Sequence, residues 1–287
     1  MVTRGLLNLV LVVLALVMGL IIYFEPGLEP ADIPQPLTTL LVADDAIGIH
    51  IERVKYDPVS FIKRNGRWYL VTEKQELPAS TFQLQALLRL LETSSSSHYA
   101  ADTVNLESLG LDPPQATVTI DDVAILFGNT APLDGKRYLQ IDATVHLIED
   151  RYQHLINAGW TNFVERKLLP ADKSIRTLRL PDMTLTLTDK DQWQLSPGKP
   201  GISADAIQQL LDRWDRVSAL YARRYDGRTS DEIITLEFSD SPEPLTFMVI
   251  AHSPELVLAR PDWGIQYHLT HDAEETLLTL DEPEQDQ

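Results

Sequence analysis

Ten residues of this 287-residue chain predict its first structural element: Phe61-Ile62-Lys63-Arg64-Asn65-Gly66-Arg67-Trp68-Tyr69-Leu70. Asn-Gly between two runs of strand-forming residues is the strongest short-range signal for a β-hairpin. A two-residue turn pairs Phe61 with Leu70 and places Trp68 on the same face. The stretch therefore predicts an antiparallel sheet with an aromatic and aliphatic core face.

A similar pattern follows 125 residues later, where Asp191-Gln192-Trp193-Gln194-Leu195 resembles Gly66 to Leu70. The segment Ile202-Ser203-Ala204 likewise falls 125 residues after Leu77-Pro78-Ala79. Each segment leads into a predicted helix, and Ser203 is the expected N-cap of the second one. Apolar residues recur at helical spacing in both helices: Leu84, Leu87, Leu88 and Leu91 in the first, and Ile207, Leu210, Leu211, Trp214 and Val217 in the second.

Short strand patterns surround these helices in both copies. They cover residues 47–51, 116–120, 124–127, 138–141 and 145–148, and then 175–180, 183–187, 233–238, 245–250, 255–259 and 266–269. Consecutive short strands with tight turns favour antiparallel pairing. One helix per sheet implies an α+β fold in which the helix covers one face. The sequence therefore predicts two tandem repeats of an antiparallel sheet with one covering helix, preceded by a single transmembrane helix.

These patterns divide the chain into six segments. Residues 1–24 are a predicted transmembrane anchor, and residues 25–42 are a proline-rich spacer that lifts the body off the bilayer. The first α+β repeat covers 43–150, a helical connector 151–172, and the second repeat 173–280. Residues 281–287 form an acidic tail that we expect to be disordered.

The anchor prediction rests on residues 6–24, which carry no charge and one polar side chain, Asn8. At about 1.5 Å per residue this stretch matches the hydrocarbon thickness of a bilayer. Arg4 precedes the stretch and Glu25, Glu29 and Asp32 follow it, so the positive-inside rule places the N-terminus in the cytoplasm. We therefore expect a single-pass bacterial inner-membrane protein whose body lies in the periplasm.

A cleaved signal peptide is the alternative interpretation of the same stretch. Signal peptides have a shorter apolar region, of roughly 7–15 residues, and end in a small-x-small cleavage site. Here the apolar run is longer and ends in Ile-Tyr-Phe-Glu-Pro. The pattern favours an uncleaved signal anchor.

Composition excludes several classes of function. The net charge is −18, and an acidic surface repels phosphate backbones, so nucleic acid is not an expected partner. High solubility explains this charge more simply than an acidic docking surface does. Since the chain has no cysteine, disulfides, thiol catalysis and cysteine-based metal sites are excluded.

Several segments, in this order, resemble a bacterial family known as domain of unknown function 4340 (DUF4340). They are the N-terminal helix, the hairpin 65–70, Leu77-Pro78-Ala79, Leu109-Gly110-Leu111-Asp112-Pro113-Pro114, Phe127-Gly128-Asn129, Arg137-Tyr138-Leu139 and Val145-His146-Leu147-Ile148. The resemblance implies a membrane-attached envelope protein, and some relatives resemble auxiliary components of ABC-type transport or gliding machinery. It provides no catalytic residues to place on this sequence.

A search for chemistry finds no catalytic, cofactor or metal motif. His268-x-x-His271-Asp272 is the one close histidine cluster, but positions three apart on a strand face opposite sides. The loop from Gly128 to Arg137 lacks P-loop spacing, and a hairpin loop is the better interpretation. We therefore expect a protein that is not an enzyme and that holds no cofactor, although an active site assembled from distant residues stays an open alternative.

One basic patch stands out as a candidate partner-binding site. It consists of Arg216, Arg223, Arg224 and Arg228 with Tyr221 and Tyr225. Arginine and tyrosine are favoured at protein interfaces. The alternative is that the arginines pair with nearby aspartates, among them Asp212, Asp215, Asp226 and Asp231, on a solvated face.

These features favour a membrane-anchored periplasmic accessory or scaffold protein of the cell envelope. Its partners would be the inner membrane, through residues 6–24, and other envelope proteins, such as those of a transport complex. The alternative is a periplasmic module that binds a ligand or polysaccharide in the groove between the two repeats. An unrecognised hydrolase ranks third.

The topology is testable with reporters fused after Asp32. We expect a periplasm-active reporter to function there, because the charges on either side of the apolar stretch direct the body outward. Enzyme activity of the fusions in intact cells is the measurement. Activity from a cytoplasm-specific reporter alone would reverse the predicted orientation.

Overall fold

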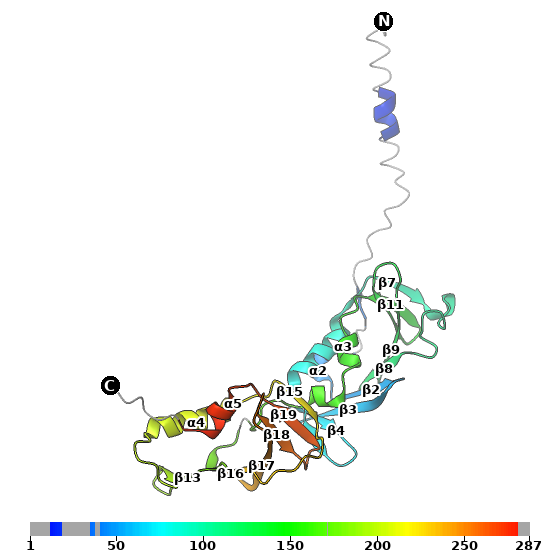
Figure 1. The fold of residues 1–287 in the computed structure, drawn as a ribbon. Coiled ribbons are helices and arrows are strands. Elements are labelled where there is room, and N and C mark those ends of the chain that lie inside the picture. The colour runs from blue at the N-terminus through cyan, green and yellow to red at the C-terminus, as the bar shows by residue number, and fades with distance from the viewer. Residues whose placement is uncertain (1–11, 19–34, 38–40, 171, 281–287) are drawn as a thin grey trace.

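The computed structural model describes residues 12–18, 35–37, 41–170 and 172–280 (Figure 1). Residues 12–18 form an exposed helix, while the rest of the predicted anchor 6–24 lies outside the described residues. Most of the predicted spacer 25–42 and all of the predicted tail 281–287 lie outside them as well. Within the described part of the chain, no helix is both long enough and apolar enough to span a bilayer.

The first module, residues 43–150, is built on a nine-stranded antiparallel sheet with the order β5-β4-β3-β2-β8-β9-β10-β11-β7. Its strands are β2 Gly48–Arg53, β3 Tyr56–Arg64, β4 Arg67–Val71, β5 Glu76–Pro78, β7 Ser97–Ala100, β8 Ala116–Ile120, β9 Val123–Thr130, β10 Arg137–Ile141 and β11 Thr144–Ile148. Helix α2, Thr81–Leu88, covers the sheet and continues into a 3-10 turn, Arg89–Glu92. Two further 3-10 turns are Ala43–Asp45 and Ala101–Thr103.

A two-residue strand attaches the preceding chain to this module. Strand β1, Gln35–Pro36, pairs with β6, Ser94–Ser95, and the Leu37 amide donates to the Thr93 carbonyl at 3.1 Å. Leu37 is buried. The described end of the predicted spacer therefore lies against the first module.

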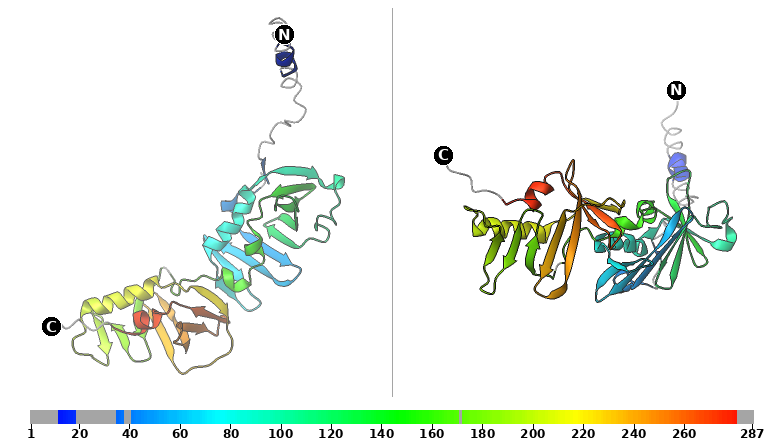
Figure 2. Two further views of the ribbon diagram at one scale, coloured as in Figure 1. Left: turned by 45° about the horizontal axis from the view of Figure 1, so that its top comes forward. Right: turned by 60° about the horizontal axis from the view of Figure 1, so that its bottom comes forward.

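The second module, residues 173–280, is built on an eight-stranded antiparallel sheet with the order β14-β13-β12-β16-β17-β18-β19-β15. Its strands are β12 Ile175–Arg179, β13 Thr184–Leu187, β14 Trp193–Ser196, β15 Tyr221–Arg224, β16 Ile233–Phe238, β17 Ser241–Ala251, β18 Val257–Arg260 and β19 Ile265–His268. The long helix α4, Ala204–Arg216, lies along one face of this sheet, next to α5, Ala273–Leu278 (Figure 2).

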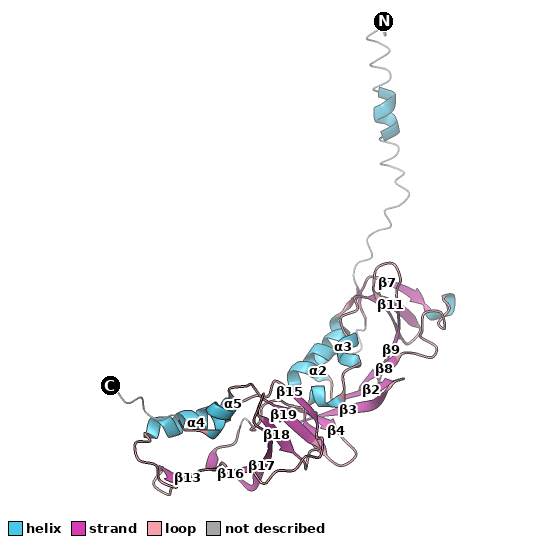
Figure 3. Cartoon of the chain, in the orientation of Figure 1, coloured by secondary structure: helices cyan, strands magenta, loops and turns pink. Residues whose placement is uncertain are grey.

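The two sheets have the same topology. When β5 is left out, the strand order of the first sheet is β4-β3-β2-β8-β9-β10-β11-β7, and that of the second is β14-β13-β12-β16-β17-β18-β19-β15. Strands at the same place in the two orders also come in the same order along the chain. Figure 3 shows one main helix against each sheet. The predicted α+β class, with two antiparallel sheets and few helices, is confirmed.

The hairpin forms as predicted, with Phe61 opposite Leu70. Asn65 and Gly66 have φ angles of 50° and 77°, the left-handed conformation that a tight hairpin turn requires. Phe61, Trp68 and Leu70 are 1%, 3% and 1% exposed. They form the predicted aromatic and aliphatic core face.

The positions at which the two helices begin change the predicted 125-residue spacing of the repeat. Ser203 caps α4 as expected, its hydroxyl accepting from the Ala206 amide at 3.1 Å. Helix α2 begins only at Thr81, after its cap Ser80, because Leu77 and Pro78 belong to strand β5. The two caps are thus 123 residues apart, although the tryptophans are 125 apart. The segment between strand and helix is two residues shorter in the second module.

The connector, residues 151–172, joins both modules through its backbone. Its helices are α3, Gln153–Ile156, and a 3-10 turn, Trp160–Phe163, so the helical prediction holds for these parts only. The stretch 163–168, from the last residue of this turn onward, is bonded on both sides. Toward the first module, the Ser80 amide donates to the Phe163 carbonyl at 2.7 Å and the Glu165 amide to the Pro78 carbonyl at 2.9 Å.

Toward the second module, the Ala219 amide donates to the Arg166 carbonyl at 2.9 Å and the Leu168 amide to the Val217 carbonyl at 3.2 Å. The Phe163 ring packs edge-on against Phe61, with centroids 5.0 Å apart. One continuous cluster of buried apolar residues includes both modules and the connector. Residues 163–168 of the connector are therefore bonded to both modules.

Three segments that carry the family resemblance meet at one place in the first module. The Asn129 amide donates to the Leu109 carbonyl at 2.7 Å. Buried Arg137 donates to the Gly128 carbonyl at 2.6 Å and makes a two-pronged pair with Asp150 at 2.9 and 2.7 Å. These contacts fix the turn before β8 against the β9–β10 hairpin, which is a structural role.

Gly128→Ala should destabilise the fold by roughly 1–3 kcal/mol, because a Cβ there would overlap the Leu109 carbonyl oxygen and lie 3.0 Å from Leu111 Cγ. Urea unfolding of the full chain is the measurement. Gly48→Ala is the matched control, since the nearest atom to its added Cβ is Asp121 Oδ1 at an ordinary 3.6 Å. Equal stability of the two variants would contradict this packing.

Candidate functional site

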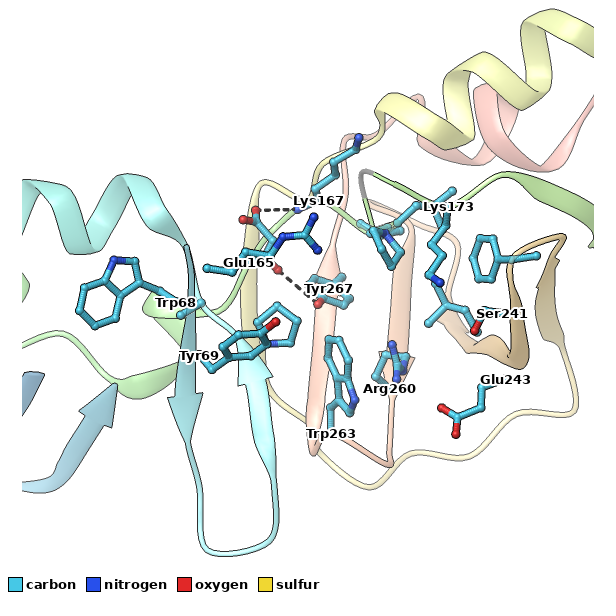
Figure 4. A pocket seen from close by; sticks show the side chains of 18 of the residues that line it. Trp68, Tyr69, Glu165, Lys167, Lys173, Ser241, Glu243, Arg260, Trp263 and Tyr267 are labelled. Carbon is cyan, nitrogen blue, oxygen red and sulfur yellow. Dashed lines mark hydrogen bonds between the residues drawn. The ribbon is translucent and has the colours of Figure 1, made fainter. Parts of the chain in front are cut away.

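A groove of about 480 Å³ lies where the two modules meet (Figure 4). Its walls come from β4 and the start of α2 in the first module, from the connector, and from the β16–β17 and β18–β19 hairpins of the second module. The shared connector bonds to both modules and helps to hold these walls in place. The residues that define its chemistry are Tyr69, Thr81, Lys167, Arg260, Trp263 and Tyr267.

Aromatic side chains from both modules face each other across the groove. Half-buried Tyr69 points from the first module toward Trp263 and Tyr267 of the second (Figure 4). Tyr267 is buried, its hydroxyl donates to the Glu165 carbonyl at 3.3 Å, and burial raises the pKa of this hydroxyl. It therefore links β19 to the connector and stays protonated.

Arg260 fixes the orientation of Trp263. The Arg260 guanidinium lies 3.8 Å from the centroid of the Trp263 ring and donates to both carboxylate oxygens of Asp262, at 3.0 and 2.6 Å. Arg260 is 7% exposed, so its charge is paired and stacked within the wall. The half-buried indole of Trp263 presents its surface to the groove.

The groove lining is basic, although the protein is acidic. Four cationic residues, Arg67, Lys167, Lys173 and Arg260, outnumber two acidic ones, Glu165 and Glu243. Ion pairs join Arg67 to Asp172 at 3.4 Å and Lys173 to Asp240 at 3.9 Å. Among the described residues, Lys167 is the lining cation without an ion-pair partner. It is the lining group that is open to an anionic ligand group.

One contact closes the groove at the tip of the β4–β5 hairpin. The side-chain amide of Gln75 donates to the Asp262 carbonyl at 2.6 Å, across the two modules. With the Tyr267–Glu165 bond, this contact holds the Trp263 wall against the first module. The groove is thus preformed by hydrogen bonds from both sides.

The predicted basic patch is distributed over three elements. Arg216 ends α4; Tyr221, Arg223 and Arg224 lie on edge strand β15; Tyr225 and Arg228 follow it. Since neighbouring residues on a strand face opposite sides, Arg223 and Arg224 diverge. The Arg223 guanidinium lies 4.9 Å from the Tyr221 ring centroid, whereas that of Arg224 lies 5.9 Å from the Trp160 ring of the connector.

Several side chains of this patch make contacts within the protein itself. Arg228 pairs with Asp226 at 2.9 Å, as the ion-pair alternative predicts, and the Tyr225 hydroxyl donates to the Arg228 carbonyl. The Tyr221 ring stacks on His268 at 4.5 Å, and its hydroxyl donates to Glu255 at 2.9 Å. Binding of a partner by the patch stays a prediction.

The histidines lie in separate polar networks. His268 Nδ1 is 2.6 Å from Glu255 Oε1, and His268 Nε2 is 3.0 Å from the side-chain amide of Gln266, while His271 is exposed in the turn before α5. His252 lies between Glu232 and Glu274, at 2.8 and 2.9 Å. Within the described part of the chain, no group of three or more His, Asp or Glu residues is placed to hold a metal ion.

These observations define a two-module α+β protein with a preformed aromatic and basic groove at the module junction. The chain belongs to the family described as Domain of unknown function (DUF4340), whose pattern matches residues 68–229. The match runs from Trp68 through the connector to the loop after β15, so it covers more than half of the chain. No curated protein and no solved structure matches this chain.

The stability contributed by the His252 cluster should fall as pH rises. Burial lowers the pKa of His252, but the hydrogen bonds and charges of Glu232 and Glu274 outweigh it and raise that pKa overall. The stabilisation from protonated His252 is fully present below the pKa of histidine in the unfolded chain, about 6.5. It is lost as the pH rises through the higher pKa of His252 in the folded protein. An NMR titration of the His252 ring checks this.

The matched variant for this titration is the double substitution Glu232→Gln and Glu274→Gln. It should move the His252 midpoint downward, because the raising charges are removed while burial is kept. An unchanged midpoint would show that the two carboxylates do not hold the imidazolium.

Proposed function

We propose that this chain is a non-catalytic binding protein of the bacterial cell envelope. In this proposal residues 6–24 anchor it in the inner membrane, its N-terminus is cytoplasmic and its body faces the periplasm. There it acts as an accessory or scaffold that holds a protein partner in the groove between its modules. A component of a transport complex is one such partner.

The groove between the modules is the observation that carries the proposal. Its volume of about 480 Å³ falls within the range of ligand sites, roughly 300–1,000 Å³, and is large enough to take side chains of a protein partner. The walls are preformed by the connector, so binding there costs little reordering. Tyr69, Trp263 and Arg260 are residue types that dominate binding energy at protein interfaces.

Lys167 supports an acidic feature in the partner. Its ammonium group has no ion-pair partner among the described residues, and it lies on the rim of a groove whose other cations are paired. A carboxylate of the partner would complete that pair at the rim. Such a contact adds orientation and association rate more than raw affinity.

A polysaccharide is the second candidate occupant, favoured by the opposed rings of Tyr69 and Trp263 (Figure 4). Flat aromatic faces with polar groups beside them can hold the apolar face of a sugar ring, while Lys167 and Glu165 bond its hydroxyls. This alternative uses the same groove and differs in the class of molecule that is bound.

Photo-crosslinking in intact cells tests the proposal at two neighbouring positions. Thr81 lines the groove, whereas Phe82 is 74% exposed and lies outside the lining. With a photoreactive phenylalanine analogue at each position in turn, we expect a discrete protein adduct from position 81 and none from 82. Mass spectrometry of the adduct identifies the partner.

The adduct at position 81 should weaken severalfold when Lys167→Glu or Trp263→Ala is added, because each change removes a groove contact. Equal crosslinking from positions 81 and 82 would contradict a specific groove site. The polysaccharide alternative replaces the leading one if two results are obtained together. Position 81 gives no protein adduct, and soluble envelope glycans quench the part of the tryptophan fluorescence that is missing in the Trp263→Phe variant.

A further inference from the structure

The two sheets differ at one edge, although their topologies otherwise correspond. In the first module β5 pairs with β4 and protects that edge of the sheet. In the second module β14, the counterpart of β4, is the last strand of its sheet. No described strand lies beside β14 on its outer side.

Loop length explains the missing strand. In the first module nine residues, 72–80, separate β4 from α2, and they include a turn in which the Thr72 amide donates to the Gln75 carbonyl at 2.9 Å. That turn sends residues 76–78 back along β4. In the second module only seven residues, 197–203, separate β14 from α4, which leaves no room for the returning strand.

Two residues of β14 have backbone amide and carbonyl groups that are not used within the sheet. The Thr188 amide donates to the Gln192 carbonyl at 2.9 Å, so Gln192, Gln194 and Ser196 direct their backbone groups toward β13. The backbone groups of Trp193 and Leu195 therefore face away from the sheet. At the matching position of the first module, the Trp68 carbonyl accepts from the Ala79 amide at 2.9 Å.

A hollow beside this edge has the place that β5 fills in the first module. It measures about 430 Å³ and lies between β14, the loop at Gly198 and Ile202, and Ile207 of α4. Trp193, Leu195 and Ile202 are partly exposed there. The counterparts of Trp193 and Leu195 in the first module, Trp68 and Leu70, are only 3% and 1% exposed, and Leu77 of β5 is 0% exposed.

We infer that β14 is a docking site for one extended segment of a protein partner, which adds to the second sheet as β5 adds to the first. The segment runs antiparallel to β14, bonds the backbone of Trp193 and Leu195, and places an apolar side chain in the hollow where Leu77 would lie. Such strand addition is a general mode of peptide recognition.

The site suits a single peptide segment better than the edge of another sheet. In the first module the occupant of the equivalent place is a single strand of three residues, 76–78, which pairs with β4 alone. Pairing with β14 of a second copy of this protein is the alternative that the ultracentrifugation experiment below tests. The site is separate from the groove between the modules, and no residue lines both cavities.

A synthetic peptide with the sequence Lys74–Ser80 is the probe, because it contains the strand that fills the equivalent place in the first module. Fluorescence anisotropy with the full chain in detergent should show saturable one-to-one binding. The same peptide with aspartate in place of Leu77 should bind at least about tenfold more weakly, since its central side chain loses apolar burial.

Hydrogen exchange locates the bound peptide. Peptide addition should protect the amides of Trp193 and Leu195, whereas those of Trp68 and Leu70 should not change. Protection at Trp68 and Leu70 would mean that the peptide replaces β5 in the first module, which would overturn the proposal.

The sharpest variant replaces residues 197–203 with residues 72–80, so that the second module gains its own hairpin and Ser80 takes over the helix cap. Peptide binding should then be lost, because the edge is occupied. If the graft fails to fold, Leu195→Pro serves instead, since it removes only an outward-facing amide. Groove variant Lys167→Glu should bind the peptide normally, which separates this proposal from the function proposed above.

Two results would overturn the docking site. One is the absence of saturable binding, or equal binding by the wild-type and grafted chains. The other is a dimer of the wild-type chain in analytical ultracentrifugation that the graft abolishes, which would assign the edge to a second copy of this chain.

Discussion

The backbone from Phe163 to Leu168 is the constraint on which the rest of the structure depends. It bonds to Pro78 and Ser80 on one side and to Val217 and Ala219 on the other, so one chain acts as an edge partner for both modules. Inter-domain linkers are commonly exposed and weakly bonded, which allows relative motion. Here the apolar core continues through the connector, and the connector fixes the positions of the groove walls.

Local signals made much of the fold predictable. Asn65-Gly66 specifies its own turn, and Ser203 specifies its own cap, because both depend on neighbours within three residues. Strand β5 escaped prediction because it has only three residues, one of them a proline. Strands β7 and β15 escaped because they are short and are set by distant partners, β11 and β19. The groove escaped for the same reason: Tyr69 and Trp263 are far apart in sequence, and neither stands out within its own segment.

The segments that carry the family resemblance fall into two groups. The hairpin 65–70 and Leu77-Pro78-Ala79 contribute lining residues to the groove, whereas the segments 109–114, 127–129 and 137–139 act on the fold. Gly128 lets the backbone at Leu109 approach closely, and Arg137 satisfies the carbonyl of Gly128 while paired with Asp150. None of these four lines the groove. A shared pattern of this kind marks a shared scaffold, and members of the family can differ in what they bind, because function resides in sites placed on a fold.

The shorter segment between β14 and α4 has an evolutionary consequence. Repeats that begin as equals can specialise when a small change in a surface loop alters one copy and leaves both cores intact. Here a difference of two residues separates a copy whose sheet edge is closed from one whose edge is open, while the buried faces of α2 and α4 are retained. The first module, with its closed sheet edge, can serve as a structural support. The second module, with its open edge, is free to change the partners that it binds.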